Sequence, residues 1–165
     1  MSDVTMGNQQ PSLTDIELGW LCGIIDGEGC VYIYRRGGAR IDYKPGIRVA
    51  MCCFDTIEYL SQLLHKADVP HHITTYKSSK EKNRQANKCI TIEGQKRLLK
   101  ILPWLTPHLI TKKKQAAVVW QFCEERLKRW HRSEYSETQL ALIEVASIMN
   151  KRGYQEEGST TIRKE

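Results

Sequence analysis

Two acidic residues set among glycines are the part of this sequence best suited to chemistry. Asp26 and Glu28 alternate with Gly27 and Gly29 at the end of residues 1–30, a segment that contains no lysine or arginine. Two facing carboxylates, with backbone carbonyls freed at a helix end and a phosphate oxygen, can hold Mg²⁺, which prefers oxygen ligands. A divalent ion between an attacking water and a leaving oxygen promotes phosphodiester hydrolysis. The plainer alternative is that each acid only caps a turn.

A run of three lysines is the second group of side chains with chemical potential. Lys112, Lys113 and Lys114 fall at the start of a helix expected from Thr111 to roughly Trp130. Cations at a helix N-terminus oppose the helix dipole, so an external anion such as phosphate would offset them. The alternative is a solvated basic helix start.

Three glycines spaced four residues apart lie on the helix that leads to the acids. Gly19, Gly23 and Gly27 share one helical face, and Cys22 broadens this stripe of small residues. A glycine inside a helix costs about 1 kcal/mol relative to alanine, so three of them indicate a packing or functional reason. Either the helix packs tightly on its own sheet, or it crosses the same helix of a second subunit about a two-fold axis. In the second case the acids of both subunits would meet.

Capping residues mark the elements that must position these side chains. Capping boxes predict three helix starts, at Thr14 with Glu17, Asp55 with Glu58, and Ser136 with Gln139. The first helix is expected to end at Gly27 and Gly29. A further helix should run from about Gln95 to Pro103, and the last helix should end near Gly153.

Between these helices, apolar and polar residues alternate with a period of two, which predicts two β-hairpins. One hairpin covers residues 31–52 with a turn at Gly37–Gly38, and the other covers residues 71–92 with a long basic tip. The order αββαββα with extra C-terminal helices predicts an α+β fold, in which a four-stranded antiparallel sheet packs one face on helices. The other face would be polar and basic, which suits the DNA major groove. The alternative is a face that is only solvated.

Charge supports a polyanionic partner. The 165 residues carry 25 Lys+Arg and 19 Asp+Glu, a net charge of +6, yet residues 1–30 hold five acids and no cation. The positive charge is therefore concentrated in later blocks, among tyrosine, serine and asparagine residues. The uncharged stretches are too short to span a bilayer, which excludes a membrane protein.

Length and cysteine usage indicate one intracellular domain. We expect a disordered N-terminal segment at residues 1–12, a single domain at residues 13–153 and a C-terminal tail at residues 154–165. The six cysteines include no CxxC pair, so free thiols in a reducing compartment are expected. A zinc cluster of cysteines and histidines is disfavoured by their spacing.

Residues Leu21 to Gly29, LCGIIDGEG, resemble the nine-residue signature of the LAGLIDADG homing endonucleases. With the element order, the resemblance covers about residues 13–132. It implies an αββαββα homing-endonuclease-like fold and, because the chain holds one signature, a homodimer. The implied activity is a Mg²⁺-dependent, intron-encoded DNA endonuclease, and Mn²⁺ or Ca²⁺ would bind the same site. It would hydrolyse both strands of a long pseudo-palindromic double-stranded target and leave short 3′ overhangs.

The same resemblance assigns roles to individual residues. It implies that Glu28 binds the catalytic metal, that the Gly27 carbonyl faces the metal, and that Asp26 has a lesser, more structural part there. Lys112 falls on a lysine that stabilises phosphate charge or orders the attacking water, and Cys53 falls where a water-organising glutamine often lies. The implied dimer interface contains Gly19, Cys22 and Gly23.

Strand parity and loop position mark the residues expected to contact DNA. Outward strand positions would read base edges, while cations on the long loop and at the helix start would bind phosphate. These candidates are Tyr32, Tyr34, Arg36, Arg40, Asp42, Lys44, Arg48, His72, Thr74, Tyr76, Lys80, Lys82, Arg84, Asn87, Thr91, Lys113 and Lys114.

Two other functions fit the same residues. One is a maturase, which binds intron RNA as a splicing cofactor, and the other is a DNA-binding regulator with a retired active site. The intact Asp26-Gly27-Glu28 sequence and Lys112 favour the endonuclease, because a protein that only binds has no use for a metal site.

Overall fold

The computed structural model describes residues 12–37, 41–78, 85–128 and 134–151, and it confirms the α+β order expected from the sequence. The turn at Gly37–Gly38 and most of the long basic tip fall at or beyond the edges of these ranges. The elements are α1 (Asp15–Glu28), β1 (Gly29–Arg36), β2 (Asp42–Met51), α2 (Phe54–Lys66), β3 (His72–Tyr76), β4 (Asn87–Glu93), α3 (Gln95–Leu105), the 3₁₀ helix η1 (Thr106–His108), α4 (Lys113–Leu127) and α5 (Glu137–Met149).

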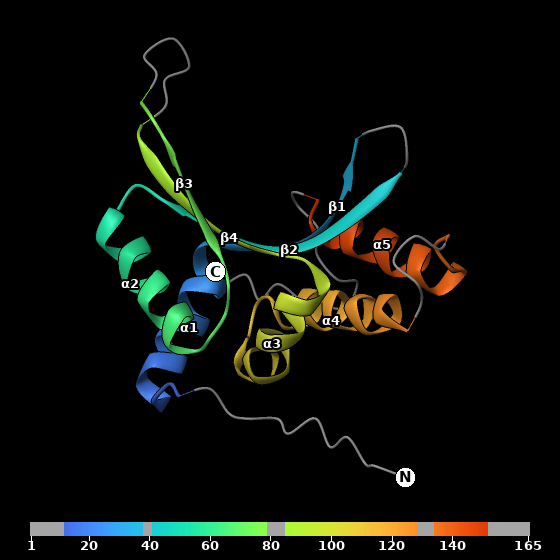
Figure 1. Cartoon of the computed structure of the whole chain (residues 1–165), viewed down its shortest axis with the longest axis horizontal. Helices are drawn as coiled ribbons and strands as arrows, with labels where there is room; N and C mark the ends of the chain where they lie inside the picture. The colour runs from blue at the N-terminus through green and yellow to red at the C-terminus, as the bar shows by residue number, and fades with distance from the viewer. Residues whose placement is uncertain (1–11, 38–40, 79–84, 129–133, 152–165) are drawn as a thin grey trace, which may run out of the picture.

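The four strands form one antiparallel sheet in the order β1-β2-β4-β3. Figure 1 shows that the sheet is strongly curved, that its two hairpins rise on opposite sides, and that the helices lie beneath it. We call the surface away from the helices the outer face. Directly opposed residues point to the same side of a sheet, so the register places Cys30, Arg48, Thr91 and His72 in one row across the outer face.

The hydrophobic core lies between the other face of the sheet and the helices. Val31, Ile47 and Ile92 form a row on that face, and all three are buried. They belong to the same cluster as Leu21 and Ile25 of α1. Burying an aliphatic side chain of this size contributes about 1.5–3 kcal/mol, so the two-residue alternation fixes which face of the sheet is left for solvent or a partner.

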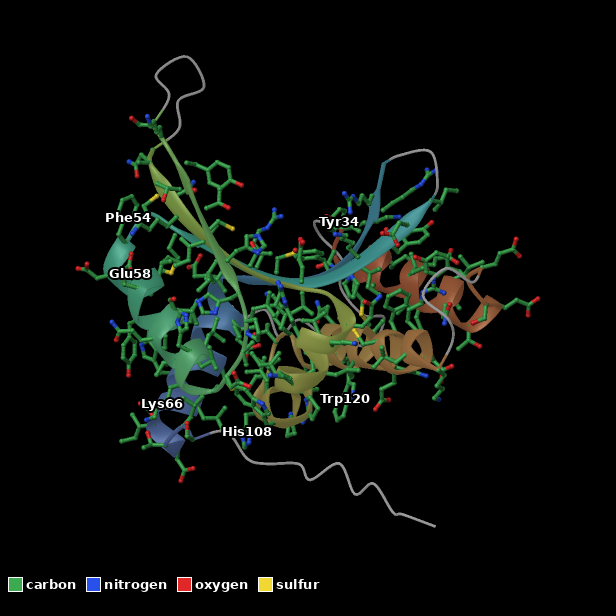
Figure 2. All side chains as sticks on the ribbon, in the orientation of Figure 1. Tyr34, Phe54, Glu58, Lys66, His108 and Trp120 are labelled. Atoms are coloured by element: carbon green, nitrogen blue, oxygen red, sulfur yellow. The ribbon has the colours of Figure 1, made fainter. Side chains whose placement is uncertain are left out.

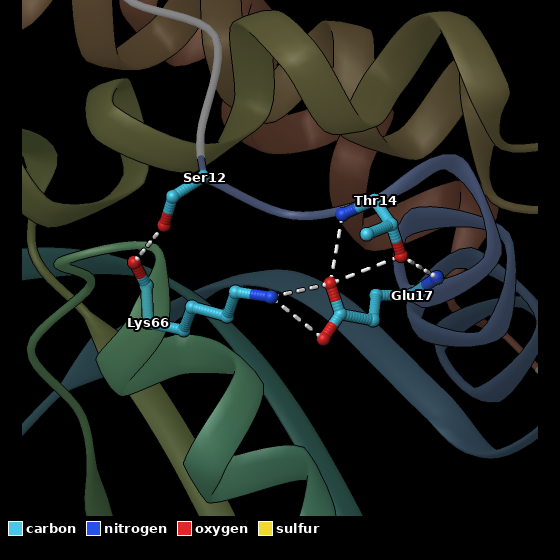
Figure 3. Close-up of polar contacts among 4 residues, drawn as sticks. All are labelled: Ser12, Thr14, Glu17 and Lys66. Atoms are coloured by element: carbon cyan, nitrogen blue, oxygen red, sulfur yellow. Dashed lines mark hydrogen bonds and ion pairs between the residues drawn. The ribbon is translucent and has the colours of Figure 1, made fainter.

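Two of the three expected capping boxes are confirmed. Thr14 and Glu17 cap α1, and Ser136 and Gln139 cap α5. At α1 the Lys66 ammonium also donates to both Glu17 oxygens, at 2.9 and 2.8 Å, and the Ser12 hydroxyl donates to the Lys66 carbonyl at 2.6 Å (Figure 3). These contacts tie the first turn of α1 to the last turn of α2.

The capping box predicted at Asp55 and Glu58 is wrong. The α2 helix begins at Phe54, two residues earlier than that prediction requires, and Cys53 occupies the cap position. Asp55 therefore lies in the first turn, where its charge still favours the helix dipole. Glu58 instead forms an ion pair with Lys88 of β4, and Figure 2 shows Phe54 and Glu58 on α2 beside the sheet.

Several helix ends differ from expectation. The α1 helix continues through Gly27 to Glu28, and only Gly29 ends it. A Cβ on Gly29 would lie 2.4 Å from the Ile25 carbonyl oxygen, which explains the glycine there. The α3 helix runs two residues past Pro103, because a proline in the last turn removes one hydrogen bond without stopping the chain. Among the described residues, every helix falls short of the length and apolarity that crossing a membrane requires.

Candidate active site and nucleic-acid interface

Asp26 lies where the last turn of α1 meets the segment that precedes α4. Its two carboxylate oxygens accept hydrogen bonds from the backbone N–H groups of Ile110, at 2.7 Å, and Lys112, at 2.8 Å. A carboxylate that accepts backbone hydrogen bonds forms charge-assisted contacts of the stronger kind. Asp26 therefore anchors the end of α1 to two residues that lie 84 and 86 positions further along the chain.

Lys112 is brought to the same place by its side chain as well as by its backbone. Its ammonium group donates to the backbone carbonyl of Asp26 at 3.2 Å, and the side chain is half-buried. Lys112 also holds the cap position of α4, so the start of that helix is directed at the acidic end of α1. The structure thus joins Asp26 and Lys112, which the sequence analysis placed at one site.

Glu28 is exposed at the last position of α1, and Gly27 beside it is also exposed. The oxygen donors fit Mg²⁺ in type, since they comprise a carboxylate and backbone carbonyls at a helix end. One chain is nevertheless short of ligands, because Asp26 already accepts two backbone hydrogen bonds. Within the described ranges there is no group of three or more His, Cys, Asp or Glu residues that could hold a metal ion.

Asn150 is a residue of this region that the sequence analysis missed. Its side-chain amide follows α5 and donates to the Val31 carbonyl and the Ala146 carbonyl, both at 2.9 Å. Cys30 also approaches it, with the thiol 3.9 Å from the amide oxygen. The C-terminal end of α5 is therefore fastened to the start of β1, at residues two and three positions after Glu28. No sequence signal reports this contact, because it depends on how α5 packs.

The glycine stripe of α1 faces open space. Gly19, Gly23 and Gly27 are exposed, and a Cβ added to any of them would meet nothing within 4 Å. The interpretation that the stripe packs on the chain's own sheet is therefore wrong. Cys22 does not share this exposed surface, because its side chain is buried in the core, and burial raises the pKa of its thiol to about 11.

The outer face carries most of the described strand residues that were expected to contact DNA. Tyr34, Arg36, Arg48, His72, Thr74 and Tyr76 are exposed, and Tyr32, Lys44 and Asn87 are partly exposed. Figure 2 shows Tyr34 on the concave side of the sheet and Trp120 on the helical side. The Tyr32 hydroxyl donates to Glu93 at 2.9 Å across Gly46, and the Arg48 guanidinium lies 5.6 Å from the centre of the Tyr32 ring. Burial raises the pKa of Tyr32, so the hydroxyl stays a donor.

The structure does not support the prediction that Thr91 contacts DNA. It points to the outer face as its parity requires, but it is only 3% exposed. Its neighbours in the row are Arg48 and His72, which are longer and flank it on the two adjacent strands. Cys89, another outward position, is buried as well. Parity predicted the face correctly, but it did not predict that short side chains on the central strand β4 are buried there.

Other predicted contacts are engaged within the chain or lie outside the described residues. Asp42 accepts a hydrogen bond from the Tyr135 hydroxyl at 3.0 Å, and the Lys113 ammonium donates to the Pro107 carbonyl at 3.4 Å. Lys114 is exposed in the first turn of α4. Four of the predicted contacts lie outside the described ranges, namely Arg40, Lys80, Lys82 and Arg84.

Cys53 is exposed at the cap of α2. The Thr56 hydroxyl donates to its sulfur at 3.1 Å and lowers the pKa of the thiol. All six cysteines are free thiols.

No protein-family model matches the sequence, and no curated protein matches it either. Solved structures do match. The archaeal intron-encoded homing endonuclease I-Vdi141I, complexed with DNA, is 14% identical and superposes with a TM-score of 0.67 over 87% of this chain and 89% of that chain. The homing endonuclease I-CvuI, in complex with its target in the presence of Ca²⁺, is 14% identical with a TM-score of 0.66 over 86% of both chains.

A third matching structure belongs to a longer chain, of which this chain covers only part. The LAGLIDADG homing endonuclease I-LtrWI, bound to target DNA, is 20% identical with a TM-score of 0.63, over 86% of this chain but only 46% of that chain. At these identities the likeness concerns the fold, and it agrees with the fold expected from the signature Leu21 to Gly29. The chain has the fold of the LAGLIDADG homing endonucleases.

Proposed function

We propose that the chain is a LAGLIDADG-type homing endonuclease that cleaves double-stranded DNA with a divalent metal ion. The observation that carries the proposal is the contact of Lys112 with Asp26, two residues before the exposed Glu28. It sets a cation beside the acidic end of α1, next to the strand that opens the basic outer face. Neighbours of the same fold were solved as complexes with DNA, one of them in the presence of Mg²⁺ and another in the presence of Ca²⁺.

The exposed glycine stripe supports a homodimer. Gly19, Gly23 and Gly27 leave room for close approach of a second helix, and Ile16 on the same helix is 85% exposed. The chain spans 86–89% of I-CvuI and I-Vdi141I but about half of I-LtrWI, as expected if two copies here correspond to that longer chain. Two copies would also bring together two Glu28 carboxylates, whereas one chain supplies only one.

Each residue of the site has a distinct part in this proposal. When bound, Mg²⁺ supplies charge neutralisation at the phosphate and lowers the pKa of a bound water. Glu28, with the Gly27 carbonyl, would hold the ion, and Asp26 would fix the end of α1 against the segment that carries Lys112. The Lys112 ammonium would stabilise negative charge that develops on the phosphate oxygens, or orient the attacking water. The outer face would bind the major groove and set the position of the scissile bonds.

The finer properties follow from two-fold symmetry and from the family resemblance. A symmetric dimer reads a pseudo-palindromic site. Each of the two Glu28 residues would hold a metal ion for the cleavage of one DNA strand. Cleavage of both strands would leave short 3′ overhangs. Two of the neighbours are described as intron-encoded, and we propose the same origin for this chain.

The test is cleavage of the intronless allele of the gene that hosts this reading frame. We expect a double-strand break at the intron insertion site in the presence of Mg²⁺ and none in the presence of EDTA, measured on a linearised plasmid. The same plasmid with the intron inserted is the matched control, because the insertion divides the target. Tight binding to the intron RNA without any DNA break would instead identify a maturase. Tight DNA binding without a break would identify a regulator.

A further inference from the structure

A hollow of about 580 Å³ lies beside the sheet, and the proposed mechanism does not use it. Its walls are residues 42–45 of β2, the end of β4, the first turn of α3, the last turn of α4 and His72. The β2 strand pairs with β4 only from Gly46 onward, so residues 42–45 have β1 on one side and the hollow on the other. The hollow therefore lies on the side of β2 away from β1, the strand that follows Glu28.

The lining is predominantly cationic. Its charged residues are Lys44, Lys96, Arg97 and Arg126 against Asp42 and Glu93, a formal balance of +4 − 2 = +2, with His72 in addition. The two carboxylates already have donors, since Tyr135 donates to Asp42 at 3.0 Å and Tyr32 donates to Glu93 at 2.9 Å. Among the residues that line the hollow, the cations therefore outnumber the carboxylates.

Arg126 is a buried side chain that forms part of this wall. It is 6% exposed, and its guanidinium lies 4.3 Å from the centre of the Tyr135 ring. The Tyr135 hydroxyl also accepts the backbone N–H of Tyr43 at 2.9 Å, which fixes the ring against β2. Guanidinium groups stack favourably on aromatic rings, so the contact with Tyr135 holds this side chain in the wall.

The first turn of α3 adds to the same potential. It contains no acidic residue and no side-chain cap, and Gly94 precedes it at φ 99°, a conformation that favours glycine. Lys96 and Arg97 oppose the helix dipole there, while the N–H groups of a first turn have no partner inside the helix. An anion in the hollow would interact favourably with the cations and with the helix end together.

We propose that the hollow seats the sugar–phosphate backbone of bound DNA, as a phosphate contact at the edge of the base-reading surface. This inference rests on the proposed function. Lys44, Glu93 and His72 belong to the outer face as well as to the hollow, so the two surfaces are continuous. The row from Cys30 to His72 crosses four strands, which is about 14 Å at the usual strand spacing. That distance equals about four base-pair steps.

The test measures binding of a random-sequence DNA duplex as a function of salt, because a phosphate contact is independent of sequence. The double variant Lys96→Gln/Arg97→Gln is compared with the wild type by fluorescence anisotropy without Mg²⁺. We expect Kd to rise about tenfold and the slope of log K against log salt to fall by about two. Each single variant should lower the slope by about one, which keeps the test valid if the double variant fails to fold.

The matched control is Lys100→Gln on the same helix, since Lys100 pairs with Asp68 away from the hollow. It should leave the affinity and the slope unchanged. If the wild type binds DNA and the Lys96 and Arg97 variants keep its slope, the inference is overturned while the proposed function stands. If the wild type binds no duplex, the proposed function itself fails. Sensitivity of hairpin RNA binding alone to these variants would also overturn the proposal, in favour of an RNA occupant.

Discussion

Asp26 and Glu28 are two acids that lie two residues apart and have different environments. Asp26 accepts two backbone hydrogen bonds from the segment before α4, whereas Glu28 is exposed at the end of α1. A carboxylate with backbone donors stabilises the fold, and an exposed carboxylate is available to a ligand. The two acids therefore have separable effects on stability and activity.

Replacing Glu28 by glutamine should abolish cleavage and spare DNA binding. The change removes a charged metal ligand and keeps the shape of the side chain. A loss of several kcal/mol of transition-state stabilisation corresponds to about a thousandfold or more in rate. The measurements are single-turnover cleavage of the target and anisotropy with Ca²⁺. The contrasting variant, Asp26→Asn, should lower the free energy of unfolding by about 1–3 kcal/mol in chemical denaturation. Retained cutting by Glu28→Gln would refute its role at the metal.

The Cys53 thiol should react at lower pH than an ordinary thiol. Thr56 donates a hydrogen bond to its sulfur and lowers the pKa, so the thiolate is present further below the usual range. Thr56→Val removes the donor and should move the alkylation profile toward higher pH. The profile is measured by iodoacetamide labelling and mass spectrometry. Cys30 is the internal control, because burial raises its pKa and Thr56→Val should leave its profile in place.

At the scale of elements, local signals predicted what depends on a few neighbouring residues. The capping boxes at Thr14 and Ser136 and the strand alternation around Ile47 are confirmed. The box at Asp55 failed because cap residues are common and tertiary packing fixes which one starts the helix. The burial of Thr91 depends on the register of β2 against β4, and no local pattern contains that register.

The sequence predicted part of the site for the same reason. The signature around Glu28 is contiguous, so its acids were found, and Lys112 was found through the resemblance. The Asn150 contacts and the hollow at α3 join segments that are far apart in the chain, and their side chains carry no motif. Both features depend on how α4 and α5 pack against distant parts of the chain.

Asn150→Ala should loosen α5 from β1. The substitution removes hydrogen bonds to the Val31 and Ala146 carbonyls, each worth about 0.5–1.5 kcal/mol, and leaves the Val31 carbonyl without this donor. We expect the free energy of unfolding to fall by about 1–3 kcal/mol and amide exchange to rise along α5 and the start of β1. Ser147→Ala, at an exposed position of the same helix, should change neither quantity. Unchanged exchange in Asn150→Ala would show that α5 is held by its apolar contacts alone.

The whole molecule separates its charges and its open surfaces. The overall charge of +6 combines an acidic first 30 residues with later basic segments that include the outer face and the start of α4. On the proposed function, the acidic end of α1 would need a bound metal ion before it could approach the polyanion that the basic outer face would attract. The glycine stripe, in contrast, is small and uncharged, which suits contact between two copies of α1 rather than contact with DNA.

The double variant Gly19→Leu/Gly23→Leu should convert a dimer to monomers without harming the chain's own fold. An added Cβ at either position meets nothing within 4 Å inside the chain, and leaving glycine favours a helix by about 1 kcal/mol per residue. Large side chains would block close approach of two helices, so sedimentation velocity should show a monomer and target cleavage should be lost. Gln62→Leu on the exposed side of α2 controls for added surface hydrophobicity and should remain dimeric. A double variant that stays dimeric and cuts both strands would place the dimer interface elsewhere.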